Sequence, residues 1–152
     1  MAYMNERDAI SGKSAKAFII VGDTREELFY AKSLEATIEK NKVDVPVLGK
    51  ASTPKRSAGW SGTGTLTIYY VSSKFRSMMQ EYMTSGKDFW FDLVVSNEDS
   101  NSTAGEQRVV LKECNLDSVI AARFDASSDD MLEEEMPFTF NGYEIQSEFN
   151  AI

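Results

Sequence analysis

Apolar and polar residues alternate with a period of two over several short stretches, which is the spacing of half-buried β-strands. In 33–41, Leu34, Ala36 and Ile38 take one side, while serine, threonine and glutamate take the other. The same alternation runs through 63–71 and 132–140, and the stretches 15–21, 26–31, 88–95 and 106–116 also have the composition of strands. These seven stretches are therefore predicted to be strands.

One stretch has helical spacing instead. From 72 to 86 the apolar residues recur at i, i+3, i+4, i+7 and i+8, and Gly86 follows as a stop. We expect this apolar stripe to pack against the sheet: Phe75, Met78, Met79, Tyr82 and Met83. The stretch 40–62, with its prolines, glycines and serines, is expected to be a long loop. The order of elements predicts a single α+β domain over 1–152, mainly antiparallel β, with one helix.

The stretch 132–140 (LEEEMPFTF) joins a run of glutamates to the most aromatic of the predicted strands. Alternation directs its large apolar side chains to one face: Leu132, Met136, Phe138 and Phe140. Glu133 and Glu135 take the other face. Glu134 is the exception, because it falls on the apolar face, and we expect it at the wet end of the strand.

Charge is unevenly distributed along this chain of net charge −8. The segment 124–152 contains eight Asp or Glu residues and no Lys or Arg. The segment 40–62 holds five Lys or Arg residues and one Asp, a net charge of +4, which leaves −12 on the remainder. A basic loop on an acidic body suits contact with another acidic surface, such as a second copy of the chain, and equally suits an ordinary soluble loop.

Residues that would carry catalysis or bind metal are scarce. The chain has no histidine, which removes the usual general base and the common zinc ligand, and Cys114, the one cysteine, has no histidine to activate it. Of the glutamate run, only Glu133 and Glu135 lie on the same face and can converge on a cation. The stretch GWSGTG at 59–64 lacks the Lys-Ser/Thr pair of a P-loop and precedes a strand. We expect no enzyme, no cofactor and no metal site.

Three predicted strands repeat a polar row opposite an apolar row. The rows consist of Ser33, Glu35, Thr37, Glu39, Thr63, Thr65, Thr67, Glu133, Glu135 and Thr139. Any half-exposed antiparallel sheet would show such a pattern. Because the rows hold carboxylates and short hydroxyls without basic residues, they would bind nucleic acid poorly.

Four stretches carry a resemblance to a known family: AISGKSAKAFI (9–19), LEATIEKNKVDVPVLGK (34–50), SAGWSGTGTLTIYYVSSKF (57–75) and LEEEMPFTFNGYEI (132–145). In this order they resemble the tail tube proteins of contractile-tailed phages and phage-tail-like bacteriocins, in particular the family of the tube protein of the Bacillus prophage PBSX. The stretch VGDTREELFYAKS (21–33) matches in character only.

The resemblance implies a tail-tube β-sandwich or barrel with one flanking helix, whose strands join an inner β-barrel in a hexameric ring. Rings would stack into a tube that carries DNA in a phage or breaches the target membrane in a bacteriocin particle. The implied partners are further copies of the chain, the tail sheath, baseplate and tail terminator proteins, and a tape measure protein in the lumen during assembly. The particle would be a virion tail or an extracellular bacteriocin, assembled in the bacterial host cytoplasm.

Two sets of residues are expected to carry this role. The polar rows are expected to face the lumen, where carboxylates repel the phosphates of passing DNA: Glu35, Thr37, Glu39, Glu133 and Glu135. The basic loop 40–62 is expected to reach an adjacent subunit or ring through Lys50, Lys55, Arg56 and Trp60.

Two other interpretations stay open. A tube of a secretion apparatus would share the architecture, and a monomeric ligand-binding β-sandwich would share the strands. The first 18 residues hold no continuous apolar stretch suited to a signal peptide, and no segment approaches the roughly 20 apolar residues that cross a bilayer. We therefore expect a soluble protein, made in a reducing cytoplasm and without stable membrane anchoring.

Overall fold

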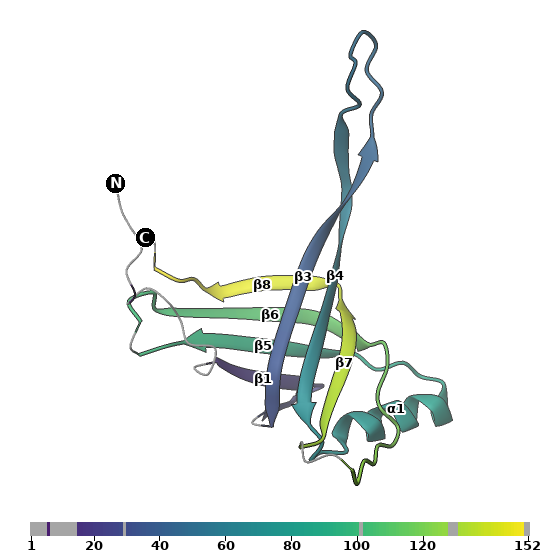
Figure 1. The fold of residues 1–152 in the computed structure, drawn as a ribbon, viewed down its shortest axis with the longest axis vertical. Coiled ribbons are helices and arrows are strands. Elements are labelled where there is room, and N and C mark those ends of the chain that lie inside the picture. The colour runs from purple at the N-terminus through teal and green to yellow at the C-terminus, as the bar shows by residue number, and fades with distance from the viewer. Residues whose placement is uncertain (1–5, 7–14, 29, 101, 128–130, 151–152) are drawn as a thin grey trace.

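Among the described residues, eight antiparallel strands form one continuous sheet that divides into two parts, called here the first and the second sheet (Figure 1). The computed structural model describes residues 6, 15–28, 30–100, 102–127 and 131–150. In the first sheet, β2 (Thr24–Glu27), β1 (Ala15–Val21), β5 (Phe91–Glu98), β6 (Glu106–Leu116) and β8 (Gly142–Ser147) lie in that order. In the second sheet, β7 (Glu133–Phe140), β4 (Lys55–Tyr69) and β3 (Ala31–Asp44) lie side by side. Residues 9–14, part of the first family-like stretch, lie outside the described residues.

Strand β6 joins the two sheets. Most of its length pairs with β5 and β8, but its last residues, Asn115 and Leu116, pair with Thr139 and Phe138 of β7. The strands of the two sheets consequently cross each other in Figure 1. The apolar row of each sheet faces the other sheet, and the buried side chains between them include Ile19, Leu66, Leu93, Leu111, Met136, Phe138 and Phe140. The α+β class, mainly antiparallel with one helix among the described residues, is confirmed.

The helix α1 (Lys74–Ser85) covers one end of this core. Phe75 is fully buried and meets Phe91 edge to face, with ring centroids 6.3 Å apart. Met78 and Met79 pack partly against the core, but Tyr82 and Met83 are exposed. The expectation that the whole apolar stripe packs on the sheet was therefore wrong for its second half, because that part of the helix extends past the sheet.

The segment 40–62 is not the long loop that its composition indicated. Strands β3 and β4 stay paired out to Asp44 and Lys55, so that only 45–54 connects them. The result is a hairpin arm, residues 39–61, that continues past the last residues paired with β7 and projects from the body (Figure 1). The alternation of apolar and polar residues did not predict the outer parts of β3 and β4. They lie away from the core, and strands there do not require a row of apolar side chains. Pro46 and Pro54 fall in the connection, where no ladder hydrogen bond is lost.

Two glycines of β4 allow aromatic rings to cross the strand. Gly62 and Gly64 pair with Phe140 and Phe138 of β7, and a Cβ at either glycine would come within 2.5 Å of the opposing ring. The GWSGTG stretch therefore belongs to a strand, and these two of its glycines make room for core side chains.

Strand β8 was not predicted from the sequence. Its side chains Tyr143 and Ile145 are exposed at the edge of the first sheet, so the stretch lacks the strong apolar row that would have indicated a strand. The second strand also lies earlier than predicted, at Thr24–Glu27 instead of 26–31.

Candidate assembly surfaces

One face of the second sheet is mainly polar, although Tyr69 and Pro137 also lie on it. Directly opposed residues of neighbouring strands share a face, and Glu35 pairs with Thr65, Thr37 with Thr63, and Glu135 with Thr67. The polar face therefore consists of Ser33, Glu35, Thr37, Glu39, Ser61, Thr63, Thr65, Thr67, Glu133, Glu135 and Thr139. The apolar residues between them face the core. All five residues that the sequence placed on a lumen surface are thus brought together on the face that turns away from the core.

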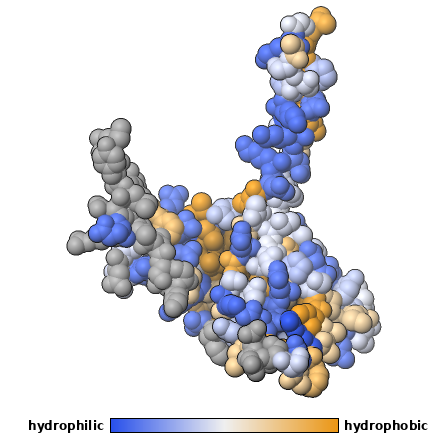
Figure 2. All heavy atoms as spheres, in the orientation of Figure 1, coloured by the Kyte–Doolittle hydropathy of each residue, from blue (hydrophilic) through white to orange (hydrophobic). Residues whose placement is uncertain are grey.

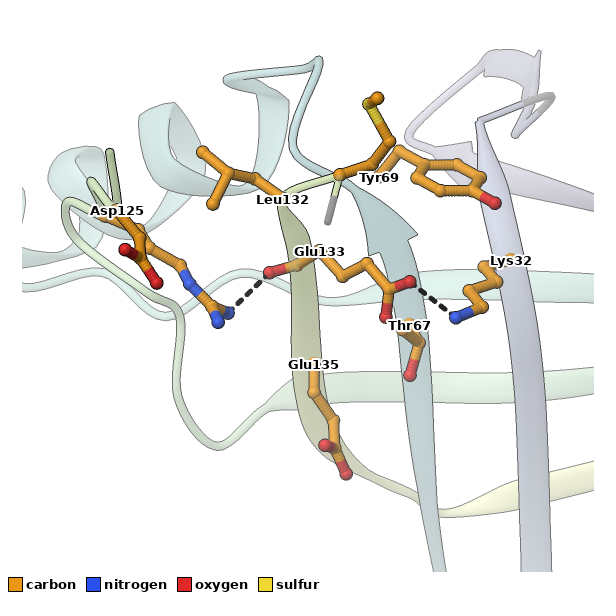
Figure 3. Close-up of a pocket in the computed structure, with 9 residues that line it drawn as sticks. Lys32, Thr67, Tyr69, Asp125, Leu132, Glu133 and Glu135 are labelled. Carbon is orange, nitrogen blue, oxygen red and sulfur yellow. Dashed lines mark hydrogen bonds and ion pairs between the residues drawn. The ribbon is translucent and has the colours of Figure 1, made fainter. Parts of the chain in front are cut away.

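The end of this face near Glu133 is not purely acidic (Figure 3). Lys32 Nζ lies 2.5 Å from Glu133 Oε1, and Arg123 Nη1 donates a hydrogen bond of 2.8 Å to the backbone oxygen of Glu133. Sequence reasoning missed both cations. Lys32 precedes the predicted strand, and a register shift between Ala31 and Ser33 brings its side chain next to Glu133. Arg123 comes from a segment without strand pairing.

These residues surround an open cavity of about 630 Å³ at the end of the sheet. Its lining combines charge with apolar surface: Lys32, Thr67, Tyr69, Arg123, Asp125, Met131, Leu132, Glu133 and Glu135. In Figure 3 the carboxylate of Glu133 turns toward Lys32, whereas that of Glu135 lies apart from Lys32. Because the Lys32–Glu133 pair is largely exposed, it contributes at most about 1 kcal/mol to stability.

Glu134 lies on the core face, between Met136 and the strand end. Its side chain is only 1% exposed, so the expectation of a wet strand end was wrong. The reason is a partner from α1: Arg76 Nη1 lies 2.6 Å from Glu134 Oε1, and the guanidinium stacks over the ring of Tyr70 at 4.3 Å. Arg76 also donates a hydrogen bond of 2.5 Å to the carbonyl oxygen of Ser72. A single, partly buried cation therefore ties the helix to β7.

The hairpin arm presents the residues that the sequence assigned to subunit contacts. Lys55 Nζ lies 3.9 Å from Asp44 Oδ1 across the arm, and Arg56 pairs with Val43 on the strand beside it. Trp60 lies at the root of the arm, where its ring packs against Phe140 with centroids 6.2 Å apart. It remains 43% exposed, so part of the ring is available to another chain.

The tip of the arm, residues 45–50, exposes aliphatic side chains that sequence reasoning left out. Val45 and Val47 are exposed, and Leu48 is 103% exposed, so that none of its surface is covered. Lys50 follows, and no ion pair of the described residues includes it. The signal was present in the sequence as the aliphatic stretch VDVPVL, but its proline and its basic surroundings predicted a loop.

The described residues offer little for catalysis. They contain no group of three or more Cys, Asp or Glu side chains able to hold a metal ion. Burial raises the pKa of the Cys114 thiol to about 12, which keeps it protonated and unreactive at neutral pH. In the part of the chain that the structure describes, no helix has the length and apolar character needed to cross a membrane.

A family model described as phage tail tube protein matches residues 2–146. The chain belongs to the phage tail tube protein family. This tail tube protein is 38% identical over 142 residues to the phage-like element PBSX protein XkdM of Bacillus subtilis strain 168, an alignment that covers 93% of each chain. The family resemblance seen in the sequence is thereby confirmed, and the role that it gives is that of a structural tube subunit.

Solved structures with the same fold agree with this assignment. A chain of the sheath–tube complex of an extracellular contractile injection system, PVC, superimposes with a TM-score of 0.62 at 18% identity, over 87% of this chain and 88% of the other. A chain of the SPP1 tail tube superimposes with a TM-score of 0.64 at 10% identity, over 93% of this chain and 81% of the other. At these identities the similarity establishes the fold, and the sequence family establishes the role.

Proposed function

We propose that this tail tube protein assembles into hexameric rings and that the polar face of its second sheet lines the lumen of the stacked rings. The observation that carries this proposal is the separation of chemistry across that sheet. One face is buried in the core, while the other holds Glu35, Glu39, Glu133 and Glu135 among short hydroxyl side chains. Against these four carboxylates stand the two cations at the same end, Lys32 and Arg123, so the face keeps a net negative charge, which repels DNA phosphates and prevents sticking during passage.

The exposed edge of β3 supports joining between subunits. This strand has 14 residues and, among the described strands, pairs only with β4. A long unpaired edge is a template for a strand of another chain. Pairing it with the second sheet of a neighbour would close six sheets into one inner barrel and leave no edge exposed.

The remaining partners follow from the tube's place in a particle. A tail sheath would surround the tube, baseplate and tail terminator proteins would close its ends, and a tape measure protein would occupy the lumen during assembly. The sheath is supported by the PVC structure, in which a chain of the same fold belongs to a sheath–tube complex. The particle is a virion tail or an extracellular bacteriocin, assembled in the host cytoplasm, and its tube delivers DNA or punctures a membrane.

The hairpin arm reaches an adjacent subunit or ring through Lys50, Lys55, Arg56 and the exposed part of Trp60. Its basic surface complements the acidic remainder of the chain. The double reversal Lys55→Glu/Arg56→Glu should therefore lower the yield of long tubes in negative-stain micrographs. The matched control is Lys87→Glu, an exposed cation just beyond α1, which should leave the yield unchanged. Unchanged polymerisation of the arm variant would count against this role.

Accessibility to thiol reagents tests the lumen assignment. Thr37→Cys lies on the polar face and Gln80→Cys lies on the exposed surface of α1, while native Cys114 is buried and stays silent. In assembled tubes, a small maleimide should label both variants, but a maleimide on a bulky polymer should label only the helix variant. Equal labelling of both variants by the bulky reagent would show that the polar face does not line the lumen. Size-exclusion chromatography and micrographs showing only monomers would favour a binding module instead of a tube.

A further inference from the structure

We propose that the cavity at the foot of the polar face, the end away from the arm, binds a protein chain inside the lumen. The chain that fits offers an apolar side chain next to a Lys or Arg. The cavity is the one of about 630 Å³ lined by Tyr69, Met131 and Glu135. This inference rests on the proposed function, because it assumes that the polar face lines the lumen, and it adds a site on that face and the chemistry of its ligand.

The cavity interrupts an otherwise polar wall with apolar surface. Figure 2 looks onto this face, where blue and pale surface covers most of the second sheet and hydrophobic surface appears near its foot. In the cavity, Tyr69 is 39% exposed and Met131 is 77% exposed, and Leu132 also lines it. Exposed apolar surface with a polar rim is typical of a binding site. Because a channel wall meets only what enters the channel, the ligand is a molecule in the lumen.

The charges of the cavity favour protein over nucleic acid. Three carboxylates line it, those of Asp125, Glu133 and Glu135. Both of its cations already bind oxygen atoms of Glu133: Lys32 Nζ lies 2.5 Å from Oε1, and Arg123 Nη1 donates a hydrogen bond to the backbone oxygen. A DNA phosphate would therefore meet a site of net negative charge whose cations are engaged. An uncharged or basic protein side chain meets no such repulsion.

The carboxylate of Glu135 specifies the charge of the ligand. Its side chain is exposed, it takes part in none of the ion pairs of the described residues, and in Figure 3 it lies apart from Lys32. A Lys or Arg next to an apolar side chain that enters the cavity would pair with this carboxylate, whereas an acidic neighbour would be repelled. The ligand is therefore a basic amphipathic segment of a protein.

Repetition around the lumen makes weak sites sufficient. A hexameric ring would present six such cavities at one height, and every further ring would add six. A long protein that occupies several cavities gains avidity although each contact is weak. Because each single contact is easily broken, the same protein can leave the lumen, and the channel is not blocked permanently.

Peptide binding is the first test, made on unassembled full-length subunits by fluorescence anisotropy. The probe is a labelled synthetic helix of Leu and Lys with leucines at i, i+3 and i+4. Met131→Ser should weaken binding roughly tenfold, because apolar contact is lost, and Glu135→Gln roughly threefold. The matched control is Met83→Ser on α1, since Met83 is also 77% exposed, and it should leave the affinity unchanged. Circular dichroism checks folding, and an unchanged affinity of Met131→Ser would overturn the site.

Altered probes separate the site from general attraction to an acidic protein. A peptide with serine in place of leucine keeps the charge, and a peptide with glutamate in place of lysine keeps the apolar surface. Both, and a short single-stranded oligonucleotide, should bind roughly tenfold more weakly than the first probe. If the serine peptide bound as tightly as the leucine peptide, charge alone would explain binding and the proposed site would be wrong. Oligonucleotide binding that Met131→Ser abolishes would instead make the cavity a nucleic-acid site.

Cysteine trapping is the second test, and it locates the probe in assembled tubes. A probe with one leucine replaced by cysteine should form a mixed disulfide with Met131→Cys tubes, assembled in its presence, roughly tenfold faster than with Met83→Cys tubes. Native Cys114 is buried and does not compete. Equal rates at the two positions would overturn the site.

The failures of the site and of the proposed function have different signatures. If Met131→Cys trapped the probe in unassembled subunits but not in tubes, a neighbouring copy would cover the cavity, and only the site would be overturned. If preformed tubes trapped a probe carried on a bulky polymer, the cavity would lie on the outer surface. That result would overturn the proposed function, because the polar face would then not line the lumen.

Discussion

The buried pair between Arg76 and Glu134 permits a sharp test of how the helix is held. Glu134 is 1% exposed, and its second oxygen, Oε2, makes no hydrogen bond within the described residues, so Arg76 is the group that compensates its charge. Replacing Arg76 by Met keeps much of the apolar stem but leaves a carboxylate buried without a cation. Removing one partner of a buried ion pair costs about 3–5 kcal/mol. That is a large part of the roughly 5–15 kcal/mol that stabilises a typical domain.

The reverse change should cost less. In Glu134→Gln, Arg76 is still partly exposed and keeps its hydrogen bond to Ser72 and its stacking on Tyr70, so we expect a loss of about 1–2 kcal/mol. In Arg76→Met/Glu134→Met no charge remains, and the stability should return to within about 1 kcal/mol of the wild type. The two substitutions should therefore be strongly non-additive.

The measurement is urea unfolding of unassembled subunits, followed by circular dichroism and tryptophan fluorescence. Lys74→Met is the matched control: its ion pair with Glu26, at 2.5 Å, is similar in length to the 2.6 Å pair of Arg76 and also joins α1 to a strand, but it is much more exposed. We expect a loss below about 1 kcal/mol for the control. A cost below 1 kcal/mol for Arg76→Met, or a double variant whose loss equals the sum of the singles, would refute the reasoning.

Two further predictions concern the core. Gly64→Ala should destabilise the fold by about 1–3 kcal/mol in the same urea assay, because the new Cβ would lie 2.5 Å from the Phe138 ring and 2.8 Å from the Glu35 carbonyl oxygen. The control Ser61→Ala, on the polar face of the same strand, should change the stability little. Equal effects of the two substitutions would argue against the ring contact. Cys114 should resist iodoacetamide at pH 8 in the native protein and react once urea unfolds it. Since its folded pKa of about 12 lies above the ordinary value of 9.0, the folded state retains the proton longer, and this residue's contribution to stability should fall as the pH rises above about 9. Rapid labelling of the native thiol would contradict the burial of Cys114.

The sequence alone determined the faces of the strands. Alternation is a property of the extended backbone, in which successive side chains point to opposite sides, so it separated Glu133 and Glu135 from Met136 and Phe138 without knowledge of the fold. The same rule brought Glu35, Thr37 and Glu39 to the polar face. The family-like stretches supplied the role, which periodicity alone leaves open, because a half-exposed sheet serves many functions.

The tertiary structure decided everything that depends on residues distant in the sequence. Glu134 broke the alternation, and only folding brings Arg76, 58 positions away, to neutralise it. Lys32 reaches Glu133 across 101 positions through a register shift that no local pattern predicts. The arm was misassigned for the same physical reason. Its strands are held by each other and not by the core, so burial leaves no periodic trace in 40–62, and only the pairing of β3 with β4 shows that the segment is a hairpin.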